Sequence, residues 1–229
     1  MRFSYKNLQN VEDESIMTMK GGDAVHKGVF KGANLSQNHS ILILGESHHH
    51  PGEADDPEYT TERVVKNYFN NPNDKCYKFF DKIAACFGFA PDDRENFWNQ
   101  VWFGNYVTES NCGVRDGRAQ NLIREHRDQY NKKLFEFVNE HGVDIIFCFS
   151  RQVYKNLPGK APFESADTRY DVPGKRDYIM KFLYKPGRRP HGDVALHKPL
   201  TVYGFCHPSA WSYFKAEHYA PFIKELVQL

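Results

Sequence analysis

The stretch that decides the fold is Ile41-Leu42-Ile43-Leu44-Gly45-Glu46-Ser47-His48-His49-His50-Pro51-Gly52. Its four consecutive aliphatic residues predict a short strand that is buried on both faces, as strands are in a parallel sheet covered by helices. We expect this strand to end at Gly45 and to be followed by a polar loop. Because ligands in open α/β sheets bind at the carboxyl ends of the strands, the polar cluster after Leu44 predicts a binding site.

The length and charge of the chain limit the kind of protein it is. A length of 229 residues suits one α/β domain over residues 1–229, with residues 1–40 as an N-terminal cover over the sheet edge and residues 158–199 as a loop-rich insert. The net charge of +1 gives no global field for nucleic acid or membranes, so any basic surface must be local. We find no signal-like N-terminus and no apolar stretch of transmembrane length, and we expect a cytoplasmic monomer without membrane contact.

The cysteines favour reduced thiols. No C-x-x-C spacing occurs among the five cysteines, which are Cys76, Cys86, Cys112, Cys148 and Cys206. An odd number without metal-binding spacing argues against a disulfide framework and against a thiolate metal or iron–sulfur site. Cys148 and Cys206 end apolar runs, and we expect both to be small core residues.

The order of apolar patterns predicts an alternation of strands and helices. Further strands are expected at residues 101–107, 143–149 and 200–206, with another extended segment at 177–184. Helical periodicity is expected from about residue 60 to 69, and at 75–87, 119–141, 151–157 and 210–229, with Ser150 as the cap of the fourth of these. This alternation predicts a three-layer α/β/α sandwich with a small, mostly parallel central sheet.

Polar side chains follow three of the predicted strands. Glu46 and Ser47 follow the first strand, Asn105 the second and His207 the last. A carboxylate, an amide and an imidazole around one crevice suit recognition of a planar heterocycle, since the amide matches a donor–acceptor edge. The carboxylate can steady a developing cation or orient water, and the imidazole can stabilise a departing anion.

Two of these strand ends resemble motifs of a known family. The motifs Gly45-Glu46-Ser47 and His207-Pro208-Ser209-Ala210 are similar to the first and second motifs of the uracil-DNA glycosylase superfamily. The resemblance covers about residues 41–211. It implies a parallel sheet sandwiched by helices, DNA as the partner, no cofactor or metal, and hydrolysis of the N-glycosidic bond of uracil or another modified base after base flipping.

The resemblance also implies roles for individual residues. Glu46 matches the family residue that acts on the sugar and the attacking water, Asn105 the residue that reads the base edge, and His207 the imidazole that binds the departing base. The other residues expected at the substrate or the DNA are Gly45, Ser47, His48, Pro208 and Ser209 for substrate contacts, and Arg188, Arg189 and the wedge candidate Trp211 for nucleic acid. The sequence departs from the family at His48-His49-His50, where a proline usually follows the first motif.

Other interpretations of the same residues remain open. The fold and the pocket would also suit a non-catalytic module that binds a nucleobase or nucleic acid. A third hypothesis is a metal-dependent hydrolase, because His48 and His50 can point the same way in an extended loop, with Glu46, Glu53 or Asp55 completing the site. Structural roles in capping, backbone hydrogen bonding or core packing are the simpler alternatives for Glu46, Asn105 and Trp211.

Overall fold

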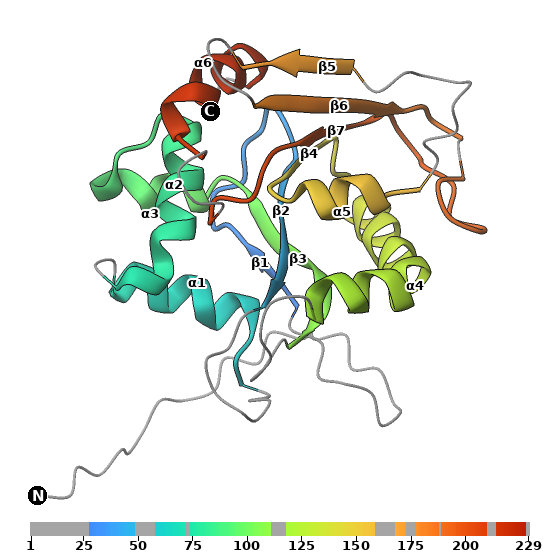
Figure 1. Cartoon of the computed structure of the whole chain (residues 1–229), viewed down its shortest axis with the longest axis horizontal. Helices are drawn as coiled ribbons and strands as arrows, with labels where there is room; N and C mark the ends of the chain where they lie inside the picture. The colour runs from blue at the N-terminus through green and yellow to red at the C-terminus, as the bar shows by residue number, and fades with distance from the viewer. Residues whose placement is uncertain are drawn as a thin grey trace, which may run out of the picture.

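The computed structural model describes residues 28–48, 58–71, 74–110, 118–158, 168–172, 177–187, 189–209 and 214–227 (Figure 1). The strands are β1 (Val29–Lys31), β2 (Ile41–His48), β3 (Trp102–Ser110), β4 (Ile145–Cys148), β5 (Thr168–Asp171), β6 (Tyr178–Tyr184) and β7 (Leu200–Gly204). The helices are α1 (Thr61–Asn70), α2 (Lys78–Cys86), α3 (Arg94–Trp98), α4 (Arg118–Glu140), α5 (Arg151–Asn156) and α6 (Ala216–Leu226). Short 3-10 turns, Lys75–Tyr77 and Pro91–Asp93, precede α2 and α3.

The described strands form one seven-stranded mixed sheet in the order β1-β3-β2-β4-β7-β6-β5. The neighbours β3, β2, β4 and β7 are parallel to one another. On the flanks, β1 pairs antiparallel with β3, β6 with β7, and β5 with β6. The α/β class is therefore confirmed, but the sheet is larger and less uniformly parallel than the sequence predicts, because β6 and β5 from the insert extend it.

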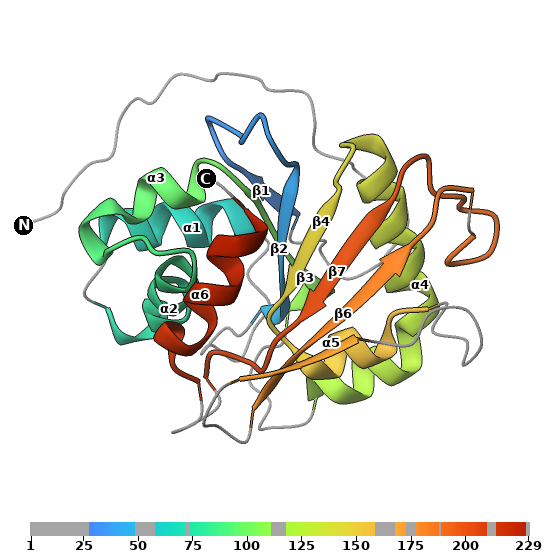
Figure 2. The ribbon, with the colours of Figure 1, turned by 90° about the horizontal axis from the view of Figure 1, so that it is seen from above.

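Helices lie on both sides of this sheet. Figure 2 shows α1, α2, α3 and α6 on one side, and α4 and α5 on the other. The alternating side chains of β2 belong to two separate hydrophobic clusters: Ile41 and Ile43 pack in the first, and Leu42 and Leu44 in the second. The prediction that this aliphatic run is buried on both faces is confirmed, and it explains why the run has no polar alternation.

Helix ends follow the expected capping chemistry. Ser150 precedes α5, and its hydroxyl accepts a hydrogen bond from the backbone N–H of Val153 at 3.2 Å. Gly142 follows α4 with a φ of 59°, a left-handed conformation that costs glycine less than other residues. Both positions confirm the boundaries that the sequence predicts. Inside α4, His126 has a non-helical backbone, an interruption that the apolar periodicity does not reveal.

Two strands are longer than the sequence predicts. β2 does not end at Gly45 but continues to His48, because β3 runs beside it to Ser110 and pairs Ser47 with Val107. Asn105 therefore lies within β3, opposite Gly45, rather than beyond its end. The parallel ladder satisfies the backbone groups of these polar residues, so a change from apolar to polar side chains does not end either strand.

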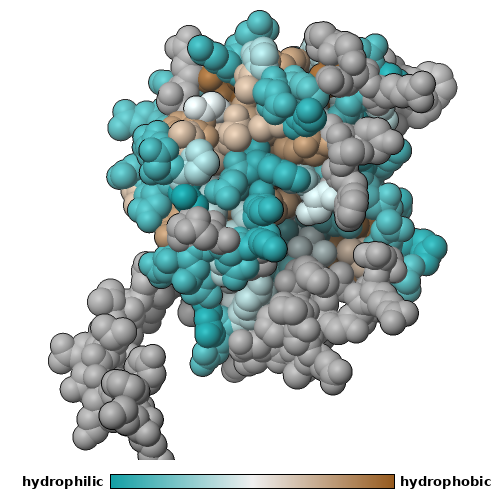
Figure 3. Space-filling model, turned by 60° about the vertical axis from the view of Figure 1, so that its left-hand side comes forward, coloured by the Kyte–Doolittle hydropathy of each residue, from teal (hydrophilic) through white to brown (hydrophobic). Residues whose placement is uncertain are grey.

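Polar side chains dominate the face of the molecule in Figure 3, and the cysteines whose burial is described lie in the core. Figure 3 shows polar side chains surrounding a smaller hydrophobic area in the upper part of one face. Among the described residues, Leu183 is the one large hydrophobic side chain that is exposed, at 43%. Cys86, Cys148 and Cys206 are buried and form no disulfide with another described residue, and the core positions expected for Cys148 and Cys206 are confirmed. No described helix has the length and apolarity needed to span a membrane.

Candidate functional site

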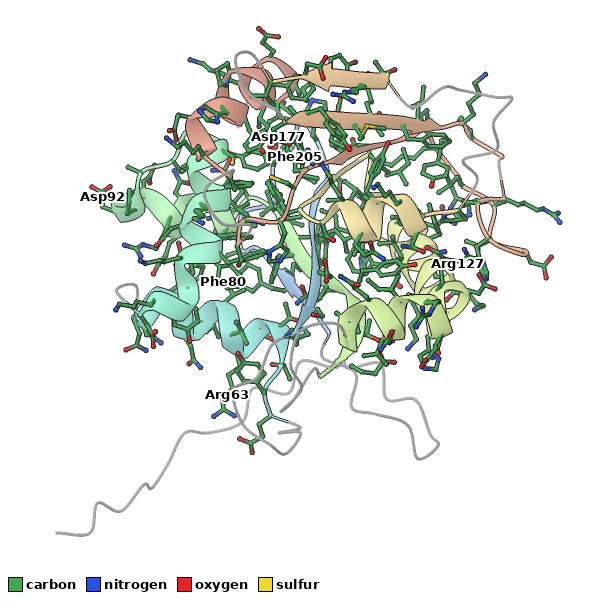
Figure 4. All side chains as sticks on the ribbon, viewed as in Figure 1. Arg63, Phe80, Asp92, Arg127, Asp177 and Phe205 are labelled. Carbon is green, nitrogen blue, oxygen red and sulfur yellow. The ribbon has the colours of Figure 1, made fainter. Side chains whose placement is uncertain are left out.

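Residues that leave the parallel strands β2, β4 and β7 meet at one edge of the sheet. Ser150 follows β4, and His207 follows β7. Because carboxyl ends of parallel strands share an edge, both residues approach the end of β2, which contains Glu46. In Figure 4, Asp177 and Phe205 are labelled where β6 begins and β7 ends, close to this edge, whereas Arg63, Asp92 and Arg127 point away from the core.

Ser150 orients the carboxylate of Glu46. The Ser150 hydroxyl donates a hydrogen bond of 2.6 Å to Oε2 of Glu46, across 104 residues of sequence. The same hydroxyl oxygen accepts from Val153, so the position of the serine is set by the helix that it caps. Among the described residues, no hydrogen bond reaches Oε1 of Glu46. One carboxylate oxygen is thus held and the other is left for a ligand or water.

His207 is held as a neutral imidazole. The backbone N–H of Ser209 donates to Nδ1 of His207 at 3.1 Å, and a ring nitrogen that accepts a hydrogen bond carries no proton. Burial lowers the pKa of His207, the negative charge of Glu46 raises it and the ammonium of Lys82 lowers it, so that the pKa lies below the ordinary 6.5. At neutral pH the proton therefore sits on Nε2. No described residue forms a hydrogen bond with that Nε2–H.

The side chain of Asn105 lies over the backbone of Gly45. A Cβ atom placed on Gly45 would stand 2.3 Å from Oδ1 of Asn105 and 3.6 Å from the ring of Phe103. Only glycine therefore leaves room for the amide at this position. The described residues form no hydrogen bond with the Asn105 side chain, so its donor and acceptor are both available.

An aromatic side chain from α2 connects these positions. The ring of Phe79 lies 5.4 Å from that of His207 and 6.2 Å from that of Phe103, measured between centroids. Asn105 and His207 thus lie on the α2 side of the sheet edge. The charge of Glu46 acts on His207, which places the carboxylate near the same ring. The structure therefore brings together the three residues that the sequence singles out.

His48 is buried against the start of α1, and the substrate contact expected for it stays a prediction. Its ring is buried, with 5% of the residue exposed, and its Nε2 lies 2.9 Å from Oγ1 of Thr61. Because Thr61 donates to the carbonyl of Gly28, the imidazole is the donor in this pair. The register of β2 shifts between Ser47 and His48, and this irregularity directs the ring toward α1.

The metal hypothesis gains no support from the described part of the chain. No group of three His, Cys, Asp or Glu side chains there is arranged to hold a metal ion. His49, His50, Glu53 and Asp55 lie outside the described residues. His48, the one histidine of the run that is described, bonds with a threonine instead.

The basic loop lies at the opposite edge of the sheet. Tyr184 at the end of β6 pairs with Leu200 at the start of β7, so residues 185–199 connect the strands at the amino end of β7 (Figure 2). Arg189 is exposed there and lies 3.8 Å from Asp193. His207, beyond the carboxyl end of β7, is not brought together with Arg189. Arg188, Ala210 and Trp211 lie outside the described residues.

The remaining predicted residues lie around His207 and the end of β2. Pro208 is buried and Ser209 is exposed. Ser47 is half-buried near the end of β2. Of these, Ser209 contributes directly through the backbone N–H that fixes the imidazole.

A buried acidic residue supports this edge but was not foreseen. The carboxylate of Asp177 accepts hydrogen bonds from Arg151 and Tyr219, from the Cys206 thiol at 3.3 Å and from the backbone N–H of Tyr178 at 2.8 Å. Burial alone would raise the pKa of Asp177, but these hydrogen bonds and the charge of Arg151 outweigh it and lower the pKa below the ordinary 3.8. Asp177 thus links the residue after Ser150 with the residue before His207.

Other contributors to the site were also missed. Lys82 and Phe79 belong to a helix that the sequence presents as an ordinary amphipathic element, and no local pattern connects it with residue 207. Ser150 had a usable signal, because it follows a predicted parallel strand and must therefore lie at the ligand-binding edge.

Comparison with known families and with curated proteins finds no family model and no curated protein that matches this chain.

Proposed function

We propose that the protein hydrolyses the N-glycosidic bond of a flipped base, uracil or another modified base, in DNA. The observation that carries this proposal is the state of His207. Its Nδ1 accepts from Ser209, so its Nε2–H is a fixed donor without a partner among the described residues. A neutral donor of this kind suits a base that leaves as an anion, because it can strengthen its hydrogen bond as charge develops.

The other groups suit the remaining parts of the reaction. As the bond between C1′ and the base nitrogen breaks, the sugar becomes positively charged, and the oriented carboxylate of Glu46 can stabilise that charge and the attacking water. The water oxygen then bonds to C1′ and gives its proton to the carboxylate of Glu46, while the base leaves as an anion with the bonding electron pair. The amide of Asn105, with which no described residue forms a hydrogen bond, offers one donor and one acceptor to the edge of a heterocycle.

The fold supports the same proposal. Four parallel strands in the order β3-β2-β4-β7, with helices on both sides (Figure 2), suit the small sheet between helices that the resemblance to uracil-DNA glycosylases implies. The motif Gly45-Glu46-Ser47 lies at the end of β2, and the motif that begins at His207 follows β7. A three-layer, glycosylase-like arrangement is therefore the fold that we infer.

A single-turnover assay tests the proposed reaction. Enzyme in excess, with chelator present, is incubated with single- and double-stranded oligonucleotides that carry uracil, xanthine, hypoxanthine or oxidised pyrimidines, and abasic sites are scored. We expect cleavage of at least one base, with a loss on the order of a hundredfold or more in His207→Ala, since one anion-stabilising donor is removed. Glu46→Gln should also be impaired.

The matched control is His197→Ala, because this exposed histidine lies in the loop at the opposite edge of the sheet. Equal loss in both histidine variants would contradict the proposed site. The absence of abasic product from every substrate would refute the proposed reaction. Retained oligonucleotide binding in that case would favour the non-catalytic binding module.

A further inference from the structure

Helix α2 holds the loop that carries His207 through two adjacent turns. Nζ of Lys82 donates a hydrogen bond of 2.5 Å to the backbone carbonyl of Pro208, across 126 residues of sequence. One turn earlier, the ring of Phe79 packs against His207, with 5.4 Å between the centroids. The loop is therefore fixed by a charged hydrogen bond on one residue and by an aromatic contact on the residue before it.

The contact of Lys82 differs from the usual situation of a lysine on a helix surface. Lys82 is half-buried, and its ammonium lies 6.0 Å from the centroid of the ring of Phe214, which precedes α6. Lys78, one turn before it, is exposed and makes no ion pair or side-chain hydrogen bond with the described residues. The two lysines of one helix thus provide a test position and a control.

The ammonium and the carboxylate of Glu46 act on His207 in opposite directions. Burial lowers the pKa of His207, the carboxylate of Glu46 on β2 raises it, and the ammonium of Lys82 on α2 lowers it. If the imidazole gained a proton, Nδ1 would become a donor and would lose the hydrogen bond from the N–H of Ser209. The carboxylate of Glu46 therefore favours protonation of His207, although the proposed reaction needs the imidazole to be neutral.

We propose that Lys82 is a positioning residue for His207: its ammonium anchors the loop through the carbonyl of Pro208 and offsets the charge of Glu46, so that the imidazole stays neutral with its proton on Nε2. The importance of Lys82 for catalysis rests on the proposed function. Its effects on the loop and on the protonation of His207 are properties of the protein without substrate. The electrostatic part requires the positive charge, and the anchoring part requires a donor that reaches the carbonyl.

The test is an NMR titration of the imidazole of His207 in the full-length protein and in four variants. Lys82→Met should raise the pKa of His207, because it removes the charge that opposes Glu46. Lys82→Arg should stay near the wild type, since it keeps the charge. Lys78→Met is the matched control and should leave the pKa unchanged. Glu46→Gln with lysine present should lower the pKa.

Cleavage measurements across pH connect the titration with the reaction. In Lys82→Met we expect the rate to fall most at mildly acidic pH and to recover partly as the pH rises and the imidazole loses its extra proton. A Lys82→Met protein with an unchanged pKa, or with the same shift as Lys78→Met, overturns the proposal. If Lys82→Met does not fold, an unchanged pKa in Glu46→Gln overturns it instead. A wild type without glycosylase activity refutes the proposed function, while the titration still decides the role of Lys82.

Discussion

Replacing Asp177 by Asn should destabilise the protein strongly, because one side chain links three elements of the site edge. The change removes the charge that Arg151 pairs with and replaces an acceptor-only group with an amide, which accepts at one atom only. Nε of Arg151 is buried and has no hydrogen-bond partner among the described residues, so the guanidinium relies there on Asp177 and on the carbonyl of Tyr178 at 2.8 Å. Removing one partner of a buried pair typically costs about 3–5 kcal/mol.

That cost must be reduced for the partial exposure of the pair. The side chain of Asp177 is 9% exposed, but that of Arg151 is 25% exposed, and its guanidinium also stacks 3.9 Å from the centroid of the Tyr178 ring. We therefore expect a loss of about 2–4 kcal/mol in the free energy of unfolding, since water and the aromatic ring compensate part of the lost pair. For a chain of this length this corresponds to a fall in Tm of roughly 5–15 °C.

Urea denaturation and thermal melting followed by circular dichroism measure this loss. Asp193→Asn is the matched control, because Asp193 is fully exposed and pairs with an exposed arginine, and it should cause no measurable change. The effect should also depend on pH. Because the pKa of Asp177 is lowered in the folded protein, its contribution is present above the ordinary 3.8 and is lost as the pH falls through the lower, folded pKa. An Asp177→Asn protein as stable as Asp193→Asn would refute the assigned network.

Four further changes test other parts of the structure. Gly45→Ala should displace the amide of Asn105, whose Oδ1 lies 2.3 Å from the added Cβ; because the end of this side chain can rotate away, we expect little change in urea denaturation but slower base release in the single-turnover assay. Thr61→Val should cost about 1–3 kcal/mol in urea denaturation by removing the buried hydrogen bond between Thr61 and Nε2 of His48, and base release should change little because Thr61 lies at the start of α1. Arg189→Gln should leave the salt dependence of oligonucleotide affinity, measured by fluorescence anisotropy, unchanged, because Arg189 lies at the opposite edge. The rate of base release should be constant above the ordinary histidine pKa of 6.5 and fall at lower pH as His207 gains a proton, since its folded pKa is lowered.

The parallel centre of the sheet could be predicted because burial on both faces leaves a clear sequence pattern. Residues 41–44 and 145–148 are continuous apolar runs. Ser150 after the second run is the cap that the sequence predicts, whereas the first strand continues through Gly45 to His48. The flanking strands leave weaker signals, since they are short or partly exposed. β1 has three residues, and three of the four residues of β5 are exposed. Their antiparallel pairing depends on the path of the insert, which no local pattern determines.

The histidine run shows why a polar cluster does not by itself define a site. Side chains of a strand alternate between its two faces, so the position of each residue in the register decides which of them meet. Gly45 and Asn105 are opposite one another in the parallel register, and this pairing, rather than the end of either strand, places the amide at the site. One register shift, between Ser47 and His48, is enough to turn the next side chain toward α1.

The same geometry explains why the supporting residues escaped prediction while the central ones did not. Glu46, Asn105 and His207 lie on or directly after parallel strands, and the topology of an α/β sheet brings such positions to one edge. Lys82 reaches that edge from a covering helix, and Asp177 reaches it from the position before the antiparallel strand β6. Their contacts are with Pro208 for Lys82, and with Arg151, Tyr219 and Cys206 for Asp177. Their task is electrostatic and depends on distances set by packing. Sequence order therefore indicates which groups can react, whereas the protonation state in which His207 is held follows from contacts that only the folded chain creates.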